Sequence, residues 1–186
     1  MVMSKLDHVL SAIDAFNQKD PHGKEFPYSE QLARWVLRLN PNPSEALRIA
    51  ARGQHIGRWT IPRDTYPMNR GGYLRWREDL KRFHAKTVGE IMAKEGYAEA
   101  EIEPVRQIIL KKNFQTNADA QTVEDALCLV FLETQFEDLH QKMPDPKMIE
   151  IILKTWKKMS AKAKEAALTI EIPAHHKALL QQALET

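Results

Sequence analysis

The stretch VEDALCLVFLETQF, residues 123–136, decides the fold class. Every residue from Ala126 to Leu132 is apolar, so this segment has no polar face and is typical of a helix buried on all sides. Other segments carry apolar residues at intervals of three and four, as amphipathic helices do, and no β-branched alternating run typical of a strand occurs. The sequence therefore predicts an all-α protein.

Helical periodicity and helix-breaking residues divide the rest of the chain. An irregular segment at 60–72 contains Pro62, Pro67 and the pair Gly71-Gly72, and Ser44 is expected to cap the helix that follows it. No repeat or linker is present, so we expect one helical bundle domain over residues 1–186. The predicted helices span 5–17, 29–39, 45–59, 73–96, 99–112, 122–139, 144–159 and 173–185.

Composition excludes several classes of protein. A single cysteine, Cys128, excludes an internal disulfide framework and multi-cysteine zinc sites, and we expect it to contribute only packing. No apolar run approaches the roughly 18–20 residues of a membrane span. These features predict a soluble, cytoplasmic protein with no membrane partner.

The charge is segregated along the chain. The net charge is only +2, yet residues 48–86 hold ten Lys and Arg against three acids, and residues 147–164 hold six Lys against Glu150. A uniformly basic profile, as in histone-like proteins, is excluded. The first basic segment predicts an anionic ligand of about the size of a phosphate.

Arginine and aromatic residues alternate in RWTIPRDTYPMNRGGYLRWR, residues 58–77. Arginine grips phosphate through a planar fork, and aromatic rings stack on bases. The alternative is an arginine–aromatic network that only holds an irregular loop in place. The residues predicted to bind substrate are Arg52, Arg58, Trp59, Arg63, Tyr66, Arg70, Tyr73, Trp76 and Arg77, with Lys154 and Lys158 from the second basic segment.

Buried titratable residues suggest a metal site. Periodicity places His84 on the buried face of its helix and Asp125 along the apolar face of the central helix. A buried carboxylate needs a cation, a metal or a cluster of hydrogen-bond donors. The simpler alternatives are a core histidine satisfied by a hydrogen bond and an exposed capping acid. His175 and His176 are expected at the surface.

Three segments resemble a known family over nearly the full chain. They are residues 50–80 (AARGQHIGRWTIPRDTYPMNRGGYLRWREDL), 123–136 and 152–160 (ILKTWKKMS). They look like the bacterial and fungal family labelled domain of unknown function 4202, for which the resemblance implies no activity.

A more distant resemblance links the chain to the HD-domain superfamily of metal-dependent phosphohydrolases, which are all-α. ALRIAARGQHIGRW (46–59) is similar to the helix with the His-Asp pair, FHAKTVGEIMAKEGY (83–97) to a later histidine helix, and VEDALCL (123–129) to the segment with the late aspartate. The pair reads Gln54-His55 here. The resemblance implies a divalent metal, of unspecified identity, held by His55, His84, Asp125 and Glu30, with Asp125 and Glu124 as catalytic residues.

We therefore expect an HD-like helical protein that binds a phosphorylated small molecule or nucleotide. If it is an enzyme, the expected class is a metal-dependent phosphohydrolase, in which the metal lowers the pKa of a bound water. The alternative is a non-catalytic RNA- or nucleotide-binding module that uses the same arginine–aromatic surface. A third possibility is a partner-docking domain whose arginines form internal ion pairs. The oligomeric state is not predicted.

Overall fold

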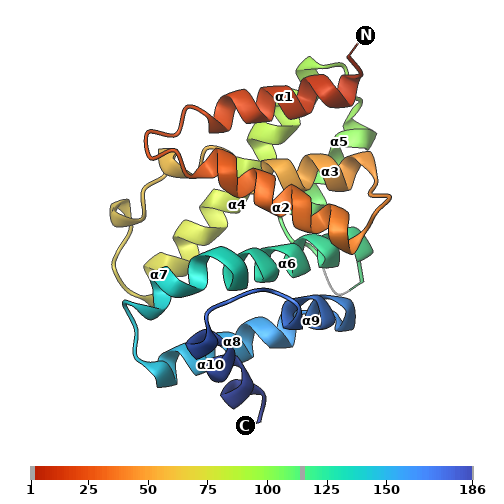
Figure 1. Cartoon of the computed structure of the whole chain (residues 1–186). Coiled ribbons are helices and arrows are strands. Elements are labelled where there is room, and N and C mark those ends of the chain that lie inside the picture. The colour runs from red at the N-terminus through yellow and green to blue at the C-terminus, as the bar shows by residue number, and fades with distance from the viewer. Residues whose placement is uncertain (1–2, 114–115, 186) are drawn as a thin grey trace. The chain divides into compact units, whose positions relative to one another are not determined.

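The chain folds into helices without strands within the residues described by the computed structural model, 3–113 and 116–185 (Figure 1). The predicted all-α class is confirmed, and the HD-like arrangement stays a prediction. The helices are α1 (Lys5–Asn17), α2 (Glu25–Leu39), α3 (Glu45–Gly53), α4 (Arg70–Lys94), α5 (Glu99–Ile109), α6 (Ala118–Val130), α7 (Phe136–His140), α8 (Asp145–Lys158), α9 (Ala161–Leu168) and α10 (Ala174–Leu184).

Several helix boundaries differ from prediction, among them the start of α2 and the end of α3. Helix α2 begins at Glu25 rather than at residue 29, because the Asp20 carboxylate accepts hydrogen bonds from the backbone N–H groups of Lys24 and Glu25. Helix α3 ends at Gly53 and is followed by two 3₁₀ turns, Arg58–Thr60 and Arg63–Thr65. Helix α9 was not predicted.

The helices belong to two compact units, Met1–Val123 and Glu124–Thr186, which we describe separately. The boundary between the units falls within α6 rather than in a linker. One domain over residues 1–186 stays a prediction.

Helix α3 is the centre of the first unit, since it packs against α1, α2, α4 and α5. Leu47, Ile49 and Ala51 are buried in it, so little of this nine-residue helix faces solvent. Ser44 caps α3 as predicted, with its hydroxyl accepting a hydrogen bond from the Leu47 N–H at 3.0 Å. Burial of α3 fixes the direction in which the chain leaves it.

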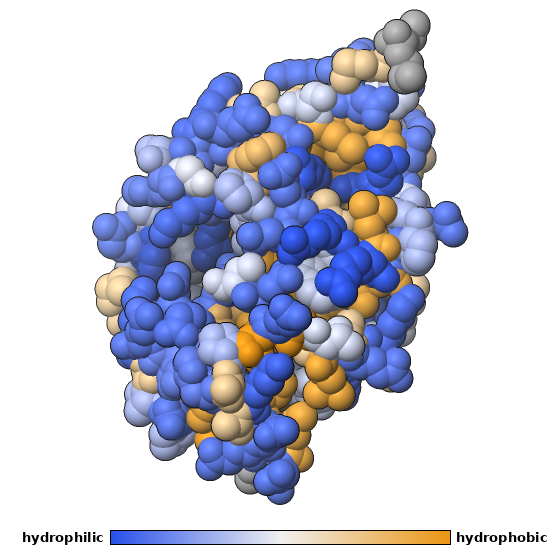
Figure 2. Space-filling model, viewed as in Figure 1, coloured by the Kyte–Doolittle hydropathy of each residue, from blue (hydrophilic) through white to orange (hydrophobic). Residues whose placement is uncertain are grey.

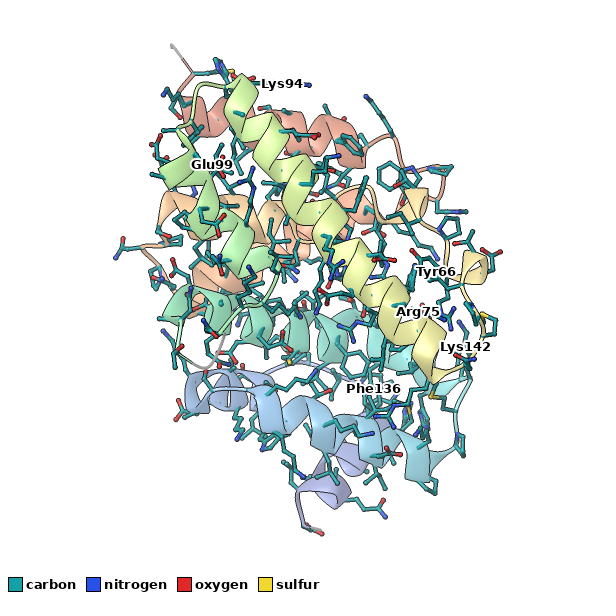
Figure 3. The ribbon with its side chains drawn as sticks, turned by 180° about the vertical axis from the view of Figure 1, so that it is seen from behind. Tyr66, Arg75, Lys94, Glu99, Phe136 and Lys142 are labelled. Atoms are coloured by element: carbon teal, nitrogen blue, oxygen red, sulfur yellow. The ribbon has the colours of Figure 1, made fainter. Side chains whose placement is uncertain are left out.

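Helix α4 anchors the irregular segment that follows α3. Figure 3 shows this long helix from Arg75 near its start to Lys94 at its end. The indole N–H of Trp76 donates to the carbonyl oxygen of Ile61 at 2.8 Å, and His84 Nδ1 lies 2.7 Å from the carbonyl oxygen of Ile56. Two buried side chains of α4 therefore hold the segment that carries His55, Arg58 and Trp59.

The second unit contains the stretch that predicts the fold class. Leu129, Leu132 and Phe136 are buried, as expected for a helix without a polar face. The α-helix changes to a π-helical turn over Phe131–Gln135 before α7 begins. Helices α8 and α10 pack against each other within this unit.

Surface hydropathy is mixed. Figure 2 shows hydrophilic side chains over most of the face in view, with apolar atoms in separate patches. Within the described ranges, no helix has the length and apolar content needed to cross a membrane.

The two glycines at the start of α4 provide a test of the backbone packing. A Cβ on Gly72 would lie 2.0 Å from the carbonyl oxygen of Pro67, whereas one on Gly71 would meet nothing closer than 3.6 Å. We expect Gly72→Ala to lower the free energy of unfolding by about 1–3 kcal/mol, since the clash is with backbone. Gly71→Ala should be neutral or stabilising by up to about 1 kcal/mol. Equal chemical denaturation midpoints for the two variants would contradict this packing.

Candidate functional site

A small cleft opens in the first unit between the turn after α3, the middle of α4 and the end of α5. It holds about 40 Å³ accessible to the centre of a water molecule. That volume accommodates about three waters, which is comparable to a phosphoryl group. Its lining consists of Gln54, His55, Arg58, Arg77, Leu80, Lys81, His84 and Lys111.

The lining of this cleft is cationic. Arg58, Arg77, Lys81 and Lys111 are four cationic residues of the lining, and no carboxylate is among the lining residues, although Lys81 also pairs with Glu78 at 3.2 Å. Lys111 has a φ of 57°, a left-handed conformation that costs about 1–2 kcal/mol for a residue with a side chain. Positive charges gathered in a concave surface raise the local concentration of anions.

His84 is a neutral imidazole at the floor of the cleft. Because a carbonyl oxygen can only accept, the 2.7 Å contact with Ile56 assigns the ring proton to Nδ1 and leaves a lone pair on Nε2. Burial lowers the pKa of His84 to about 4, with a further contribution from Arg58 and an opposing one from the Ile56 hydrogen bond. His84 is thus a core histidine whose hydrogen bond is made within the protein, as the simpler alternative predicts, and it also lines the cleft.

His55 stacks on the ring of Tyr28, with the centroids 4.5 Å apart and the planes nearly parallel. Its centroid lies 5.9 Å from that of His84. Burial, and then repulsion by Arg58 and His84, hold the pKa of His55 well below its ordinary value. Both histidines are therefore neutral at physiological pH.

A second, larger cleft shares Arg58 with the first one. It offers about 260 Å³ to water-sized groups. The Arg58 guanidinium lies 4.9 Å from the ring centre of Trp76, between the two clefts. The lining comprises Asp20, His22, Lys24, Glu25, Arg58, Trp59, Ile61, Pro62, Arg63 and Trp76.

Glu25 is a site residue that sequence reasoning missed. Its Oε2 atom lies 3.9 Å from Nδ1 of His55, and its side chain is only 13% exposed. Burial raises the pKa of Glu25 to about 7, against the opposing effect of Arg58. A carboxyl group that titrates near neutrality is able to donate or accept a proton. The helix was expected to begin at residue 29, which placed Glu25 in a loop and concealed its burial.

Arg52 and Glu30 do not belong to either cleft. The guanidinium of Arg52 binds both carboxylate oxygens of Asp14, and Glu30 lies 3.6 Å from Arg52. Internal ion pairs of this kind are what the partner-docking alternative predicts for the arginines. Glu30 has Arg52 as its cationic neighbour. A metal on His55, His84, Asp125 and Glu30 stays a prediction.

Several predicted ligand residues hold the irregular segment in place. Arg63 donates to the carbonyl oxygens of Tyr66 and Pro67, and the Tyr66 hydroxyl donates to Asp79 at 2.8 Å. Arg70 and Tyr73 are exposed in the first turn of α4. For Arg63 and Tyr66 these contacts match the structural alternative, and a ligand role for them stays a prediction.

The predicted catalytic acids lie in the second unit. Asp125 is buried, and its carboxylate accepts hydrogen bonds from the Ser160 N–H at 2.8 Å and the Ser160 hydroxyl at 2.6 Å. Glu124, also buried, lies 3.5 Å from Lys158. Asp125 therefore has a cluster of donors at the start of α9, and it is not an exposed capping acid. Lys154, like Lys158, has an acidic neighbour, since it pairs with Glu150.

Three histidines of the second unit form a cluster that the sequence did not reveal. His140, His175 and His176 each offer a ligand atom, and these atoms lie within 4.8 Å of one another. No other group of three His, Cys, Asp or Glu residues meets that criterion in the described part of the chain. The cluster can hold a metal ion. His175 is exposed as expected, but the surface position expected for His176 is wrong, because its side chain is 1% exposed.

The comparison with family models agrees with the resemblance seen in the sequence. The model described as Domain of unknown function (DUF4202) matches residues 7–180. The chain belongs to this family. No curated protein and no solved structure matches it. For this DUF4202 member, function must therefore be inferred from its own geometry.

Acid should destabilise the protein through His84. Its folded pKa of about 4 lies below the ordinary 6.5, so stability is complete above pH 6.5 and is lost as the pH falls toward 4. At about 1.4 kcal/mol for each pKa unit, the loss is about 3 kcal/mol. We expect His84→Asn, which retains a donor for Ile56, to remove this part of the dependence in urea denaturation between pH 7 and 4. An unchanged pH dependence in the variant would contradict the assignment.

Proposed function

We propose that the first unit binds a phosphorylated small molecule, with a nucleotide as the preferred class. The observation that carries the proposal is the small cleft whose lining has four cations and no carboxylate. Arginine binds phosphate through two parallel hydrogen bonds, and lysine contributes a point charge. The phosphoryl group would occupy this cleft.

The larger neighbouring cleft supports a nucleotide rather than free phosphate. It shares Arg58 with the phosphate cleft and offers Trp59, Pro62 and Ile61 as an apolar wall. Aromatic side chains stack on bases in a manner that tolerates any base. The sugar and base would lie there, with Arg58 between base and phosphate.

The small size of the phosphate cleft favours this proposal over an RNA track. A cleft with room for about three waters accepts about one phosphoryl group. Binding should therefore depend weakly on salt, because few counterions are released. A steep salt dependence with single-stranded RNA would favour the RNA-binding alternative.

Hydrolysis of the ligand is a further part of the proposal. Glu25, with its pKa of about 7, exchanges protons near neutral pH, and it lies 3.9 Å from the neutral His55 that lines the phosphate cleft. Substrates to be assayed are nucleoside mono-, di- and triphosphates, with release of inorganic phosphate as the measured product.

Substitution of one cleft arginine tests the binding site. We expect Arg77→Ala to weaken the binding of AMP and ADP by about tenfold or more, since it removes a charge-assisted hydrogen bond. Arg82→Ala is the matched control, because Arg82 lies five residues further along the same helix, is 70% exposed and does not line the cleft. Isothermal titration calorimetry measures both. Equal affinities for the two variants would refute the site.

The ionisation of His55 provides an independent test. In addition to burial, the positive charges of Arg58, Lys111 and Arg77 lower the pKa of His55. An anion bound in the cleft would offset these charges. We expect the pKa of His55 to rise when phosphate or AMP binds, so binding should tighten as the pH falls. NMR titration of the histidine ring resonances measures the shift. A His55 resonance whose titration is unaffected by saturating ligand would contradict the proposed position of the phosphate.

A further inference from the structure

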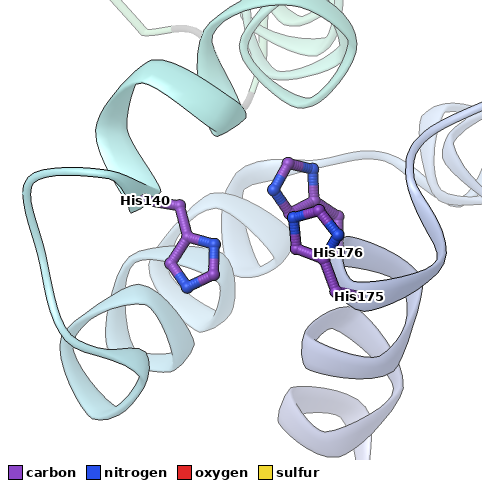
Figure 4. A group of neighbouring side chains, drawn as sticks. All are labelled: His140, His175 and His176. Carbon is purple, nitrogen blue, oxygen red and sulfur yellow. The ribbon is translucent and has the colours of Figure 1, made fainter.

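The three clustered histidines of the second unit lie where α7 ends and α10 begins (Figure 4). His140 is the last residue of α7, and His175 and His176 are in the first turn of α10. The ring centroids of His175 and His176 are 4.0 Å apart, and those of His140 and His176 are 5.5 Å apart. Imidazoles packed this closely repel one another when protonated, so the arrangement favours neutral rings.

Asp145 fixes the orientation of His140. His140 Nε2 lies 2.8 Å from Asp145 Oδ1. An ionised carboxylate only accepts, so Nε2 carries the ring proton and Nδ1 keeps its lone pair. A ring nitrogen of His140 faces the His175–His176 pair in Figure 4. A carboxylate behind a histidine is the arrangement that orients metal-ligating imidazoles.

His176 presents an unsatisfied nitrogen to the cluster. Its side chain is 1% exposed, and Nε2 is a buried atom without a hydrogen-bond partner among the described residues, although Glu137 Oε2 is 3.0 Å away. The ring of Phe136 lies edge-on to it at 4.3 Å. Burial, and then His175, lower the pKa of His176, which keeps the ring neutral. A buried polar atom without a partner is rare and calls for a ligand.

Glu137 supplies a fourth donor beside the histidines. Its Oε2 atom lies 3.0 Å from Nε2 of His176 and 3.4 Å from Nε2 of His175. Glu137 and His140 are three residues apart on α7, so they share one face of that helix. The carboxylate therefore lies close to two of the three imidazole donors.

We propose that His140, His175, His176 and Glu137 form a binding site for a divalent transition-metal ion of the zinc type. Three imidazoles and one carboxylate suit Zn²⁺ and exclude Mg²⁺ and Ca²⁺, which prefer oxygen ligands. Tetrahedral Zn²⁺ with bonds of about 2.0–2.1 Å places its nitrogen ligands about 3.3 Å apart. The donor atoms of the three histidines lie within 4.8 Å of one another and can close to that distance through small side-chain rotations, and Glu137 approaches the group from the side of His175 and His176.

A metal at this position would stabilise the second unit. It would add coordinate bonds between α7 and the start of α10 to the contacts that Phe136 and Glu137 already make there. The expected role is structural, because Glu137 completes a four-coordinate shell that leaves no position for a substrate. The site lies in a different unit from the proposed phosphate cleft and does not depend on it.

Metal titration of the untagged, chelator-treated protein tests the site. We expect one Zn²⁺ per chain, one Co²⁺ with the intense visible absorption of tetrahedral coordination, and a rise in melting temperature with either ion. His175→Ala should weaken Zn²⁺ binding at least 100-fold. His8→Ala should leave it unchanged, and it is a matched control, because both histidines are about half exposed and each has a glutamate oxygen at 3.4 Å.

Asp145→Asn tests the same site without removing a proposed ligand, because Asp145 contacts the far nitrogen of His140. Asp145 is 65% exposed, and loss of its charge should weaken Zn²⁺ binding by about 10–100-fold without loss of helical circular dichroism. Absence of saturable binding, or equal affinities for His175→Ala and His8→Ala, would overturn the proposal. Arg77→Ala should bind Zn²⁺ normally, so failure of the phosphate site and failure of the metal site are distinguishable.

Discussion

The hydrogen bond between His84 Nδ1 and the carbonyl oxygen of Ile56 is the constraint on which the small cationic cleft of the first unit depends. It joins the middle of α4 to the turn that follows α3, at a point where the chain has left regular helix. Neither group has access to water, so separating them would leave two buried polar groups unsatisfied. The bond therefore fixes the position of His55 and Arg58, and it also fixes which nitrogen of His84 faces the cleft.

The arginines of the segment 48–77 divide into two groups by their partners. Arg52 is neutralised by Asp14, and Arg63 is bound to backbone carbonyl oxygens, so both serve the fold. Arg58 and Arg77 line a cleft that lacks acids. Some arginines thus stabilise the first unit, and others give its cleft a positive charge. Which of these an arginine does depends on whether a carboxylate or a carbonyl oxygen lies beside it. This division explains why charge density along the sequence indicated an anion site without identifying its members.

The two histidine sites differ in what surrounds them. Arginine and lysine outnumber acids around His55 and His84, where Glu25 is the nearby carboxyl group and its pKa is raised to about 7, and this favours an anion. Glu137 and Asp145 lie beside the cluster of the second unit, which favours a cation. Sequence reasoning placed the metal at His55 and His84 because periodicity predicted burial of His84 and the HD-domain resemblance added His55. It placed His175-His176 at the surface because they lie in a terminal segment. Burial of His176 against Phe136 is a tertiary contact that no spacing rule reveals.

The sequence by itself determined the all-α class, the extent of α1, the Ser44 cap and the burial of most of residues 123–132, since these depend on periodicity and on side chains that contact their own helix. It also placed Asp125 on an apolar face, where it is buried, and it predicts an anion-binding surface within residues 48–86. Only the tertiary structure decided which partners those groups have: Ser160 for Asp125, Asp14 for Arg52, and the approach of α10 to α7 for the histidine cluster. Such pairings join residues far apart in the chain, and a single sequence carries no record of them.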